Sequence, residues 1–379
     1  MKKTTTAMLL GIILCSACMK KDLSKKDLND NEPLNGPPPT TCYYPSVNIS
    51  THAGAGYAGY IDGNVLLAQF KNPQAITSFG SSLFVGDRRY IRQITGTTVS
   101  TFVALPDGEN VTSLAADLSG NIYAAVGTYQ DASLIKKFSP TGTLLATWGS
   151  FKQLAYRDGD QDQARFTIIS GLAVDETGLI YVADMGSSAI RLINLDATVS
   201  TLAGGIGSGR PGTGFEDGPV STAKLGYVEG VAVTPSGDKV YVADDHAVRM
   251  ITGGNVYTIA GGSAKGFVDG DGLSARFQKL SGIAIDGAGN VYVTDNAFES
   301  GYELASHVRK VIKMTSGLVA WKVTTLAGNS YGFANGAGAD AKFNWAMEIV
   351  IDNGATTAYI ADAYNYRIRK MSLSCGITF

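Results

Sequence analysis

The stretch GLAVDETGLIYVADMGSSAIRLI (residues 171–193) contains three short apolar runs separated by turn residues. The runs are GLAVD, IYVAD and AIRLI, and Gly178 and Gly186 fall in the gaps between them. Short runs rich in β-branched residues and bounded by Gly, Asp and Ser are typical of β-strands rather than helices. The stretch therefore predicts three consecutive strands joined by turns.

The same phrase recurs along the whole chain, and a fourth run follows the third in most copies. The second run appears as LFVGD (83–87), IYAAV (122–126), IYVAD (180–184), VYVAD (240–244), VYVTD (291–295) and AYIAD (358–362). The third run appears as IRQI (91–94), IKKF (135–138), IRLI (190–193), VRMI (248–251), VRKV (308–311) and IRKM (368–371). The fourth run appears as VSTF (99–102), VSTL (199–202), VYTI (256–259) and VTTL (323–326). Ordered repetition of this kind indicates one repeat domain, although the length alone allows two or three domains.

Composition agrees with an all-β repeat and excludes several classes of protein. Glycine accounts for 46 of 379 residues, charged residues for 17% and hydrophobic residues for 45%. So many apolar residues exclude a disordered chain. The formal charge of −2 and the scattered lysines and arginines give no reason to expect a nucleic-acid partner.

The repeated phrase resembles the NHL-repeat family over about residues 47–373. The resemblance implies an all-β, six-bladed β-propeller of four-stranded antiparallel blades. The second copy departs most, because Val126 and Lys136 stand where other copies have Asp and Arg. The segment Val47–Gly54 matches the fourth run, and the last copy stops after its third run. We therefore expect the N-terminal strand to complete the sixth blade.

Residues 1–17 resemble a bacterial lipoprotein signal peptide, and the overlapping segment Leu14–Cys18 resembles its lipobox. The resemblance implies cleavage before Cys18 and lipidation of its thiol; an ordinary secretory signal or a misassigned start are the alternatives. Residues 18–41 are polar with a proline run, so we expect a flexible tether, followed by the propeller over residues 42–379. The protein is then expected to be lipid-anchored in the cell envelope, at the outer membrane, with the leaflet left open.

Two cysteines, Cys42 and Cys375, remain beyond the expected signal and lipidation site. Cys42 precedes the expected closing strand and Cys375 follows the strand with which it should pair. We expect a Cys42–Cys375 disulfide that clamps the ring in an oxidising compartment. The alternative is two free thiols at frayed chain ends.

Two recurring motifs carry acidic residues that could suggest a metal. The first is G-x-x-D-G followed by an Ala and an aromatic residue, with Asp62, Asp158, Asp217 and Asp269 at its acidic position. Its recurrence favours local backbone hydrogen bonds by the aspartates and packing between blades by Phe70, Phe166, Leu225, Phe277 and Phe343. Calcium is a weak alternative, since the bidentate Glu and flanking helices of an EF-hand are missing. The second motif pairs the Asp of the second run with the Arg of the third, which we interpret as structural ion pairs.

Residues that occur only once are better candidates for function than those that recur. The family geometry places the variable loops on one face, where binding is usually found. The candidates for ligand binding there are Arg88, Arg89, Tyr90, Tyr129, Met185, Glu229, His246, Phe298, Tyr302, His307, Tyr364 and Tyr366. Around the central channel we expect Gln74, Thr112, Ser170, Glu229, Ser281 and Met347, with Glu348 one residue on. The alternative is that these are ordinary solvated loops.

The expected function is recognition of a glycan or a peptide or protein partner, with no catalytic residues, cofactor or metal assigned. The runner-up is a metal-dependent lactonase-like or lyase-like propeller enzyme acting at the channel. That class needs a convergent ligand set, yet the channel offers only Glu229 and Glu348, and the three His stand at different repeat positions. Catalytic sequence motifs such as a nucleophile elbow or phosphate loop are also missing.

Overall fold

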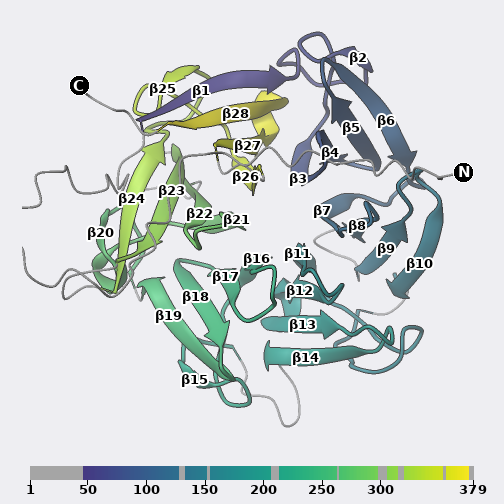
Figure 1. The fold of residues 1–379 in the computed structure, drawn as a ribbon, viewed down its shortest axis with the longest axis vertical. Helices are drawn as coiled ribbons and strands as arrows, with labels where there is room; N and C mark the ends of the chain where they lie inside the picture. The colour runs from purple at the N-terminus through teal and green to yellow at the C-terminus, as the bar shows by residue number, and fades with distance from the viewer. Residues whose placement is uncertain are drawn as a thin grey trace, which may run out of the picture. The chain divides into compact units, whose positions relative to one another are not determined.

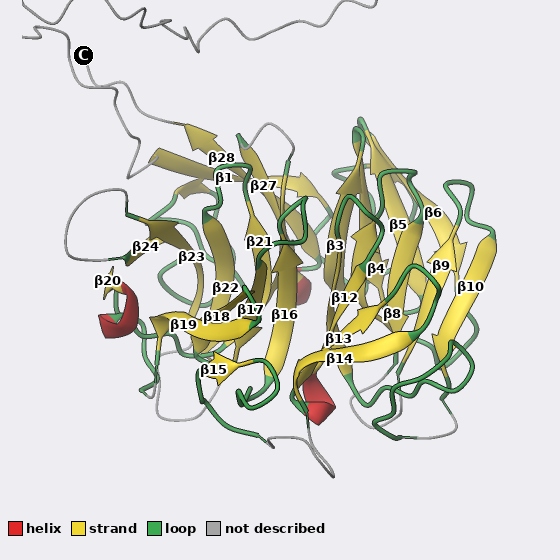
Figure 2. Cartoon of the chain, turned by 60° about the horizontal axis from the view of Figure 1, so that its bottom comes forward, coloured by secondary structure: helices red, strands yellow, loops and turns green. Residues whose placement is uncertain are grey.

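Six small antiparallel sheets surround a central channel in the computed structural model of the chain (Figure 1). The structure describes residues 46–127, 133–151, 154–205, 213–262, 264–297, 305–314, 320–352 and 356–374. Regular secondary structure in these residues is almost all strand, with three short 3-10 turns (Figure 2). The expectation of a six-bladed, all-β propeller is confirmed.

Each blade runs outward from its innermost strand in sequence order, as the repeat predicted. Blade 1 contains β3 (Pro73–Phe79), β4 (Ser82–Asp87), β5 (Tyr90–Thr95) and β6 (Thr98–Ala104); blade 2 contains β7 (Val111–Ala116), β8 (Ile122–Val126), β9 (Leu134–Phe138) and β10 (Leu144–Gly149). Blade 3 contains β11 (Ile169–Val174), β12 (Ile180–Asp184), η1 (Met185–Ser187), β13 (Ala189–Ile193) and β14 (Val199–Gly204); blade 4 contains β16 (Val228–Val233), β17 (Val240–Asp244), β18 (Ala247–Thr252) and β19 (Asn255–Gly261). Blade 5 contains β21 (Leu280–Ile285), β22 (Val291–Ala297), β23 (Ala305–Lys313) and β24 (Trp321–Ala327); blade 6 contains β26 (Ala346–Ile351), β27 (Thr357–Asp362), η3 (Ala363–Asn365), β28 (Arg367–Ser374) and β1 (Ser46–Ala53).

Four blades carry a fifth, two-residue strand that the repeat did not predict. These strands are β2 (Gly63–Asn64), β15 (Gly218–Pro219), β20 (Gly270–Asp271, followed by η2, Gly272–Ser274) and β25 (Gly336–Ala337). Each comes from the G-x-x-D-G motif, or its variant with Asn335 in place of the Asp, and pairs with the outermost strand of its own blade. The motif therefore covers an exposed sheet edge, which is a common protection against edge-to-edge association.

The apolar core lies between neighbouring blades, in six clusters. Five of these clusters contain the large side chain that ends the G-x-x-D-G motif, and all five side chains are fully buried: Phe70, Phe166, Leu225, Phe277 and Phe343. The expectation that these residues pack between blades is confirmed. Burial of a side chain of this size contributes roughly 1.5–3 kcal/mol.

A fully buried arginine in five of the blades joins the two recurring acidic motifs. Arg309, for example, contacts Asp295 at 2.9 Å and Asp269 at 2.7 Å, and its guanidinium lies over the Phe277 ring at 5.2 Å. Equivalent arginines are Arg92, Arg191, Arg249 and Arg369. The predicted Asp–Arg pairs are therefore present. In blade 2, Lys136 pairs instead with Glu109.

The expectation that the motif aspartates bond local backbone N–H groups needs correction. Asp269 accepts a hydrogen bond from the backbone N–H of Thr325 in the outermost strand at 2.8 Å, in addition to its contact with Arg309. Asp62 and Asp217 accept similar bonds from Thr101 and Thr258. These carboxylates thus join strands about forty or more residues away.

The N-terminal strand closes the ring, as expected. β1 pairs antiparallel with β28, with Ser46 opposite Ser374 and Ala53 opposite Ile368. Cys18, Cys42, Cys375 and the expected signal and tether lie outside the described residues. None of the described residues forms a helix long and apolar enough to cross a membrane.

Candidate functional site

The first strand of each blade places one side chain on the wall of the central channel. Together with Glu348, Ile168 and Ile169, the six residues Gln74, Thr112, Ser170, Glu229, Ser281 and Met347 line one narrow cavity of about 30 Å3, which we call the neck. All six are the positions that the sequence predicted around the channel. The ring arrangement brings them together from strands spread over more than 270 residues.

A wider cavity of about 460 Å3, which we call the bowl, shares part of this lining. Gln74, Glu229 and Met347 border both cavities, so the bowl leads into the neck. The remaining lining residues of the bowl are Asn72, Met185, Tyr227, Lys279, Trp345, Ala363 and Tyr364. Met185, Ala363 and Tyr364 belong to the loops between second and third strands, so the bowl lies on the loop-rich face.

Aromatic side chains from blades 4 and 6 form part of the bowl wall. Trp345 and Tyr364 lie with ring centroids 5.6 Å apart at a tilt of 47°. Tyr227 and Tyr364 are 64% and 49% exposed, so their rings remain accessible. Trp345 has a φ of 67°, a left-handed conformation that is rare for a bulky residue and is often found at functional sites.

Polar groups in the bowl and neck are held by neighbouring blades. Lys279 Nζ pairs with Glu229 Oε1 at 3.1 Å. The Asn72 side-chain amide donates to Gln74 Oε1 at 3.2 Å, and Gln74 Nε2 donates to the Val111 carbonyl at 2.6 Å. Burial raises the pKa of Glu229, while the charge of Lys279 opposes this rise.

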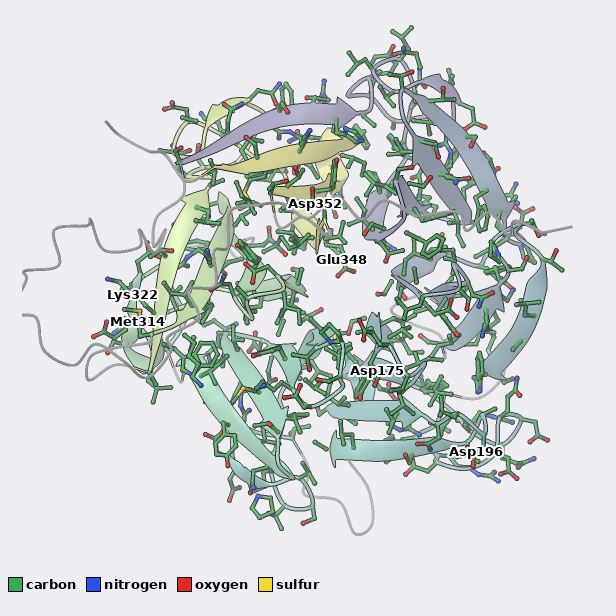
Figure 3. All side chains as sticks on the ribbon, viewed as in Figure 1. Asp175, Asp196, Met314, Lys322, Glu348 and Asp352 are labelled. Atoms are coloured by element: carbon green, nitrogen blue, oxygen red, sulfur yellow. The ribbon has the colours of Figure 1, made fainter. Side chains whose placement is uncertain are left out.

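Glu348 lies at the inner end of blade 6, facing the neck (Figure 3). Burial raises the pKa of Glu348 to about 8, although a hydrogen bond with the Ser113 side chain opposes the rise. The corresponding residues of blades 1 to 5 are all small: Ala75, Ser113, Gly171, Gly230 and Gly282. At Gly282 a Cβ atom would approach the Glu348 Cα to 2.7 Å, so adjacent inner strands are nearly in contact there.

The predicted binding candidates divide into three groups. Met185, Glu229 and Tyr364 line the bowl. The others that the structure describes lie apart from its lining: Arg88, Arg89, Tyr90, His246, His307 and Tyr366. Tyr129, Phe298 and Tyr302 lie outside the described residues.

The candidates away from the bowl mainly hold their own loops. Arg89 donates to the Leu105 carbonyl at 2.8 Å and to Tyr90 Oη at 2.8 Å. His246 bonds to Asp245 at 2.8 Å. His307 lies 4.3 Å from the Phe267 ring, and burial lowers the pKa of this imidazole to about 4.

Ala363 and four polar or aromatic residues of the bowl were not predicted from the sequence; the four are Asn72, Tyr227, Lys279 and Trp345. Each of these four stands two positions before the channel residue of its blade, so the register of the repeat could have located them. Their residue types differ from one repeat to the next, so no recurring sequence motif marks them. Among the residues described, no group of three or more His, Cys, Asp or Glu side chains could hold a metal ion.

The sequence of residues 152–372 matches the profile of the Teneurin NHL domain. The chain belongs to this family. The match starts just before blade 3 and ends in β28, and the earlier blades continue the same repeat.

Mouse Teneurin-3 is 27% identical over 353 residues, covering 83% of this chain and 13% of the relative. The chain thus spans only about an eighth of such relatives. An auxiliary nutrient binding protein from Bacteroides ovatus superimposes with a TM-score of 0.62 at 17% identity, covering 86% of this chain and 77% of that protein. A gluconolactonase from Xanthomonas campestris has a TM-score of 0.50 at 12% identity, covering 87% and 95% of the two chains. These identities establish a shared fold and nothing further.

Proposed function

We propose that this protein is a binding module that recognises a saccharide in the bowl. The observation that carries this proposal is the wall formed by Trp345, Tyr364 and Tyr227 around a solvent-open cavity. A cavity with apolar surfaces and a few fixed polar groups is the usual form of a small-ligand site. The ring geometry and the left-handed Trp345 fix the wall before any ligand arrives.

The chemistry of the lining favours a saccharide over a peptide. Aromatic faces pack against the C–H faces of a sugar ring, while Asn72, Lys279 and Glu229 offer donors and acceptors for hydroxyl groups. The bowl narrows into the neck and is bordered by five blades. Such a shape suits the end or a short segment of a glycan better than an extended peptide chain.

We also propose that a lipid on Cys18 holds the protein in the cell envelope, at the outer membrane. β1 starts at Ser46, opposite Ser374, whereas its other end at Ala53 lies opposite Ile368, near the Ala363 and Tyr364 of the bowl. At ~3.3 Å per residue the strand spans roughly 26 Å. The described part of the chain therefore begins at the end of β1 that lies away from the bowl.

A glycan panel and a peptide panel, read by thermal shift of the purified protein, test the proposed function. One glycan class should raise the melting temperature, and Trp345→Ala should weaken that binding about 10–100-fold, as for a buried aromatic anchor. Tyr257→Ala is a matched control, because Tyr257 is 45% exposed and lies on β19, away from the bowl. Binding of peptides with a flat glycan response would replace the saccharide by a peptide. Equal losses in both variants would contradict the assignment to the bowl.

A further inference from the structure

Two hydroxyl groups of the neck use their hydrogen-bond donors within the wall. The Thr112 hydroxyl donates to the Ile169 carbonyl at 2.9 Å, and the Ser170 hydroxyl donates to the Val228 carbonyl at 2.6 Å. The Gln74 amide likewise donates to the backbone of the next blade. The two hydroxyl groups therefore retain oxygen lone pairs for a group inside the neck, while Gln74 keeps a second N–H. Ser281 accepts a hydrogen bond from the Asn296 side-chain amide at 3.1 Å and keeps its O–H.

The neck also contains two carboxyl groups with different surroundings. Glu229 has an ammonium partner in Lys279 at 3.1 Å. Glu348 is stabilised by a hydrogen bond with the Ser113 side chain, and no salt bridge to it is found among the described residues. The Ser113 oxygen itself accepts a hydrogen bond from the Leu172 N–H at 3.0 Å. The Ser113 hydroxyl proton therefore points away from Leu172 and is available to the Glu348 carboxyl.

Glu348 is not explained by the architecture of the ring. The other five blades have Gly, Ala or Ser at this position, and the ring closes without a long side chain there. The irregular step of the ladder between Ala346 and Ile349 recurs between the first two strands of every blade, so the glutamate itself is what distinguishes blade 6 at this position.

We propose that the neck binds a primary ammonium group, so that the saccharide in the bowl is an amino sugar. This inference rests on the proposed function, because the bowl holds the sugar rings and the neck holds the amine. An ammonium group has three N–H donors and a positive charge, which match the Thr112 and Ser170 oxygens and the Glu348 carboxyl among the polar groups of the neck.

Proton release should accompany binding of the amine. With a pKa of about 8, Glu348 is mostly protonated at neutral pH. An ammonium group beside it favours the carboxylate, so the Glu348 proton leaves to solvent as the ammonium–carboxylate pair forms. The other charged groups near the neck are Glu229 and Lys279, which neutralise one another, and Asp245, whose charge acts on Glu229.

Isothermal titration calorimetry with a glucosamine disaccharide and its N-acetylated form tests this inference. At pH 6.5 the amine form should bind at least about 10-fold tighter, since a charge-assisted contact contributes roughly 1.5–3 kcal/mol. Titrations in buffers of different ionisation enthalpy should show release of about one proton per ligand. Glu348→Gln should abolish both the preference and the proton release, whereas Glu176→Gln, at an exposed acid outside the lining of both cavities, should preserve them.

The outcomes separate the amine from the saccharide. Equal binding of both disaccharides, unaffected by Glu348→Gln, would overturn the ammonium site and leave the saccharide function standing. If neither disaccharide binds, the saccharide function fails. Titrations with ethylammonium and Ca2+ then decide whether the neck is an ammonium site. Ethylammonium binding that requires Glu348 would support the ammonium site, whereas Ca2+ binding alone, or binding of neither ion, would overturn it.

Discussion

Replacing Glu348 by Gln should stabilise the folded protein by an amount that depends on pH. The Glu348 pKa rises from 4.5 to about 8 on folding because burial disfavours the charged form. The contribution of Glu348 to stability is thus complete below pH 4.5 and is lost as pH rises towards 8. A glutamine side chain at this position cannot titrate, yet its oxygen can still accept the Ser113 hydroxyl.

The magnitude follows from the linkage between proton binding and folding. At about 1.4 kcal/mol for each pH unit, the wild-type protein loses roughly 2 kcal/mol by pH 6 and up to about 5 kcal/mol above pH 8 relative to Glu348→Gln. These are upper values, because Glu348 keeps partial contact with the channel solvent. The advantage of the variant should therefore grow between pH 4.5 and 8 and stay constant beyond.

Urea unfolding followed by tryptophan fluorescence at pH 5, 7 and 8.5 measures this dependence. Glu176→Gln is the control, because Glu176 is an exposed acid on the surface, and it should show no such trend. A difference between wild type and Glu348→Gln that is equal at all three pH values would refute the argument, since only a titrating group produces the slope.

Two further predictions concern the scaffold. Arg309→Met leaves Asp295 buried without its guanidinium partner and should lower the free energy of unfolding by about 3–5 kcal/mol. The control Lys239→Met removes an exposed ion pair and should leave the urea midpoint unchanged. Equal effects of the two variants would contradict the role of burial. Mass spectrometry of the non-reduced, protease-digested protein should find a Cys42–Cys375 cross-linked peptide, and free thiols at both positions would disprove the clamp.

The blades could be predicted from the sequence because their determinants recur. Asp184 and Arg191, for example, have counterparts in four other copies, and both were expected to form a pair before the structure showed them buried. The closing strand was predictable for the same reason, since the sequence of Val47–Gly54 is similar to that of Val199–Gly204. A residue type that recurs at the same position of several repeats meets the same structural requirement in each blade, so the pattern itself reveals the requirement.

Much of the bowl could not be predicted in this way, because its residues differ in every blade. Trp345, Tyr227 and Lys279 occupy one repeat position but share no chemistry, so no pattern marks them. The left-handed backbone at Trp345 has no Gly or Asn signal. The long-range bonds of Asp269 were missed for a related reason: the fifth strand that carries its motif is only two residues long and has no periodicity.

Closure by β1 has a consequence for how the chain can fold. β1 is the first strand of the propeller to leave the ribosome, and its partner β28 is the last. Ser46 of β1 pairs with Ser374 of β28. The closing ladder is thus among the contacts of highest contact order in the molecule, and such contacts generally form slowly. Until synthesis ends, β1 remains an unpaired edge, and chains that meet in this state could exchange their first strands. Holding the N-terminus back until the last blade is made would therefore protect the chain from swapped assembly.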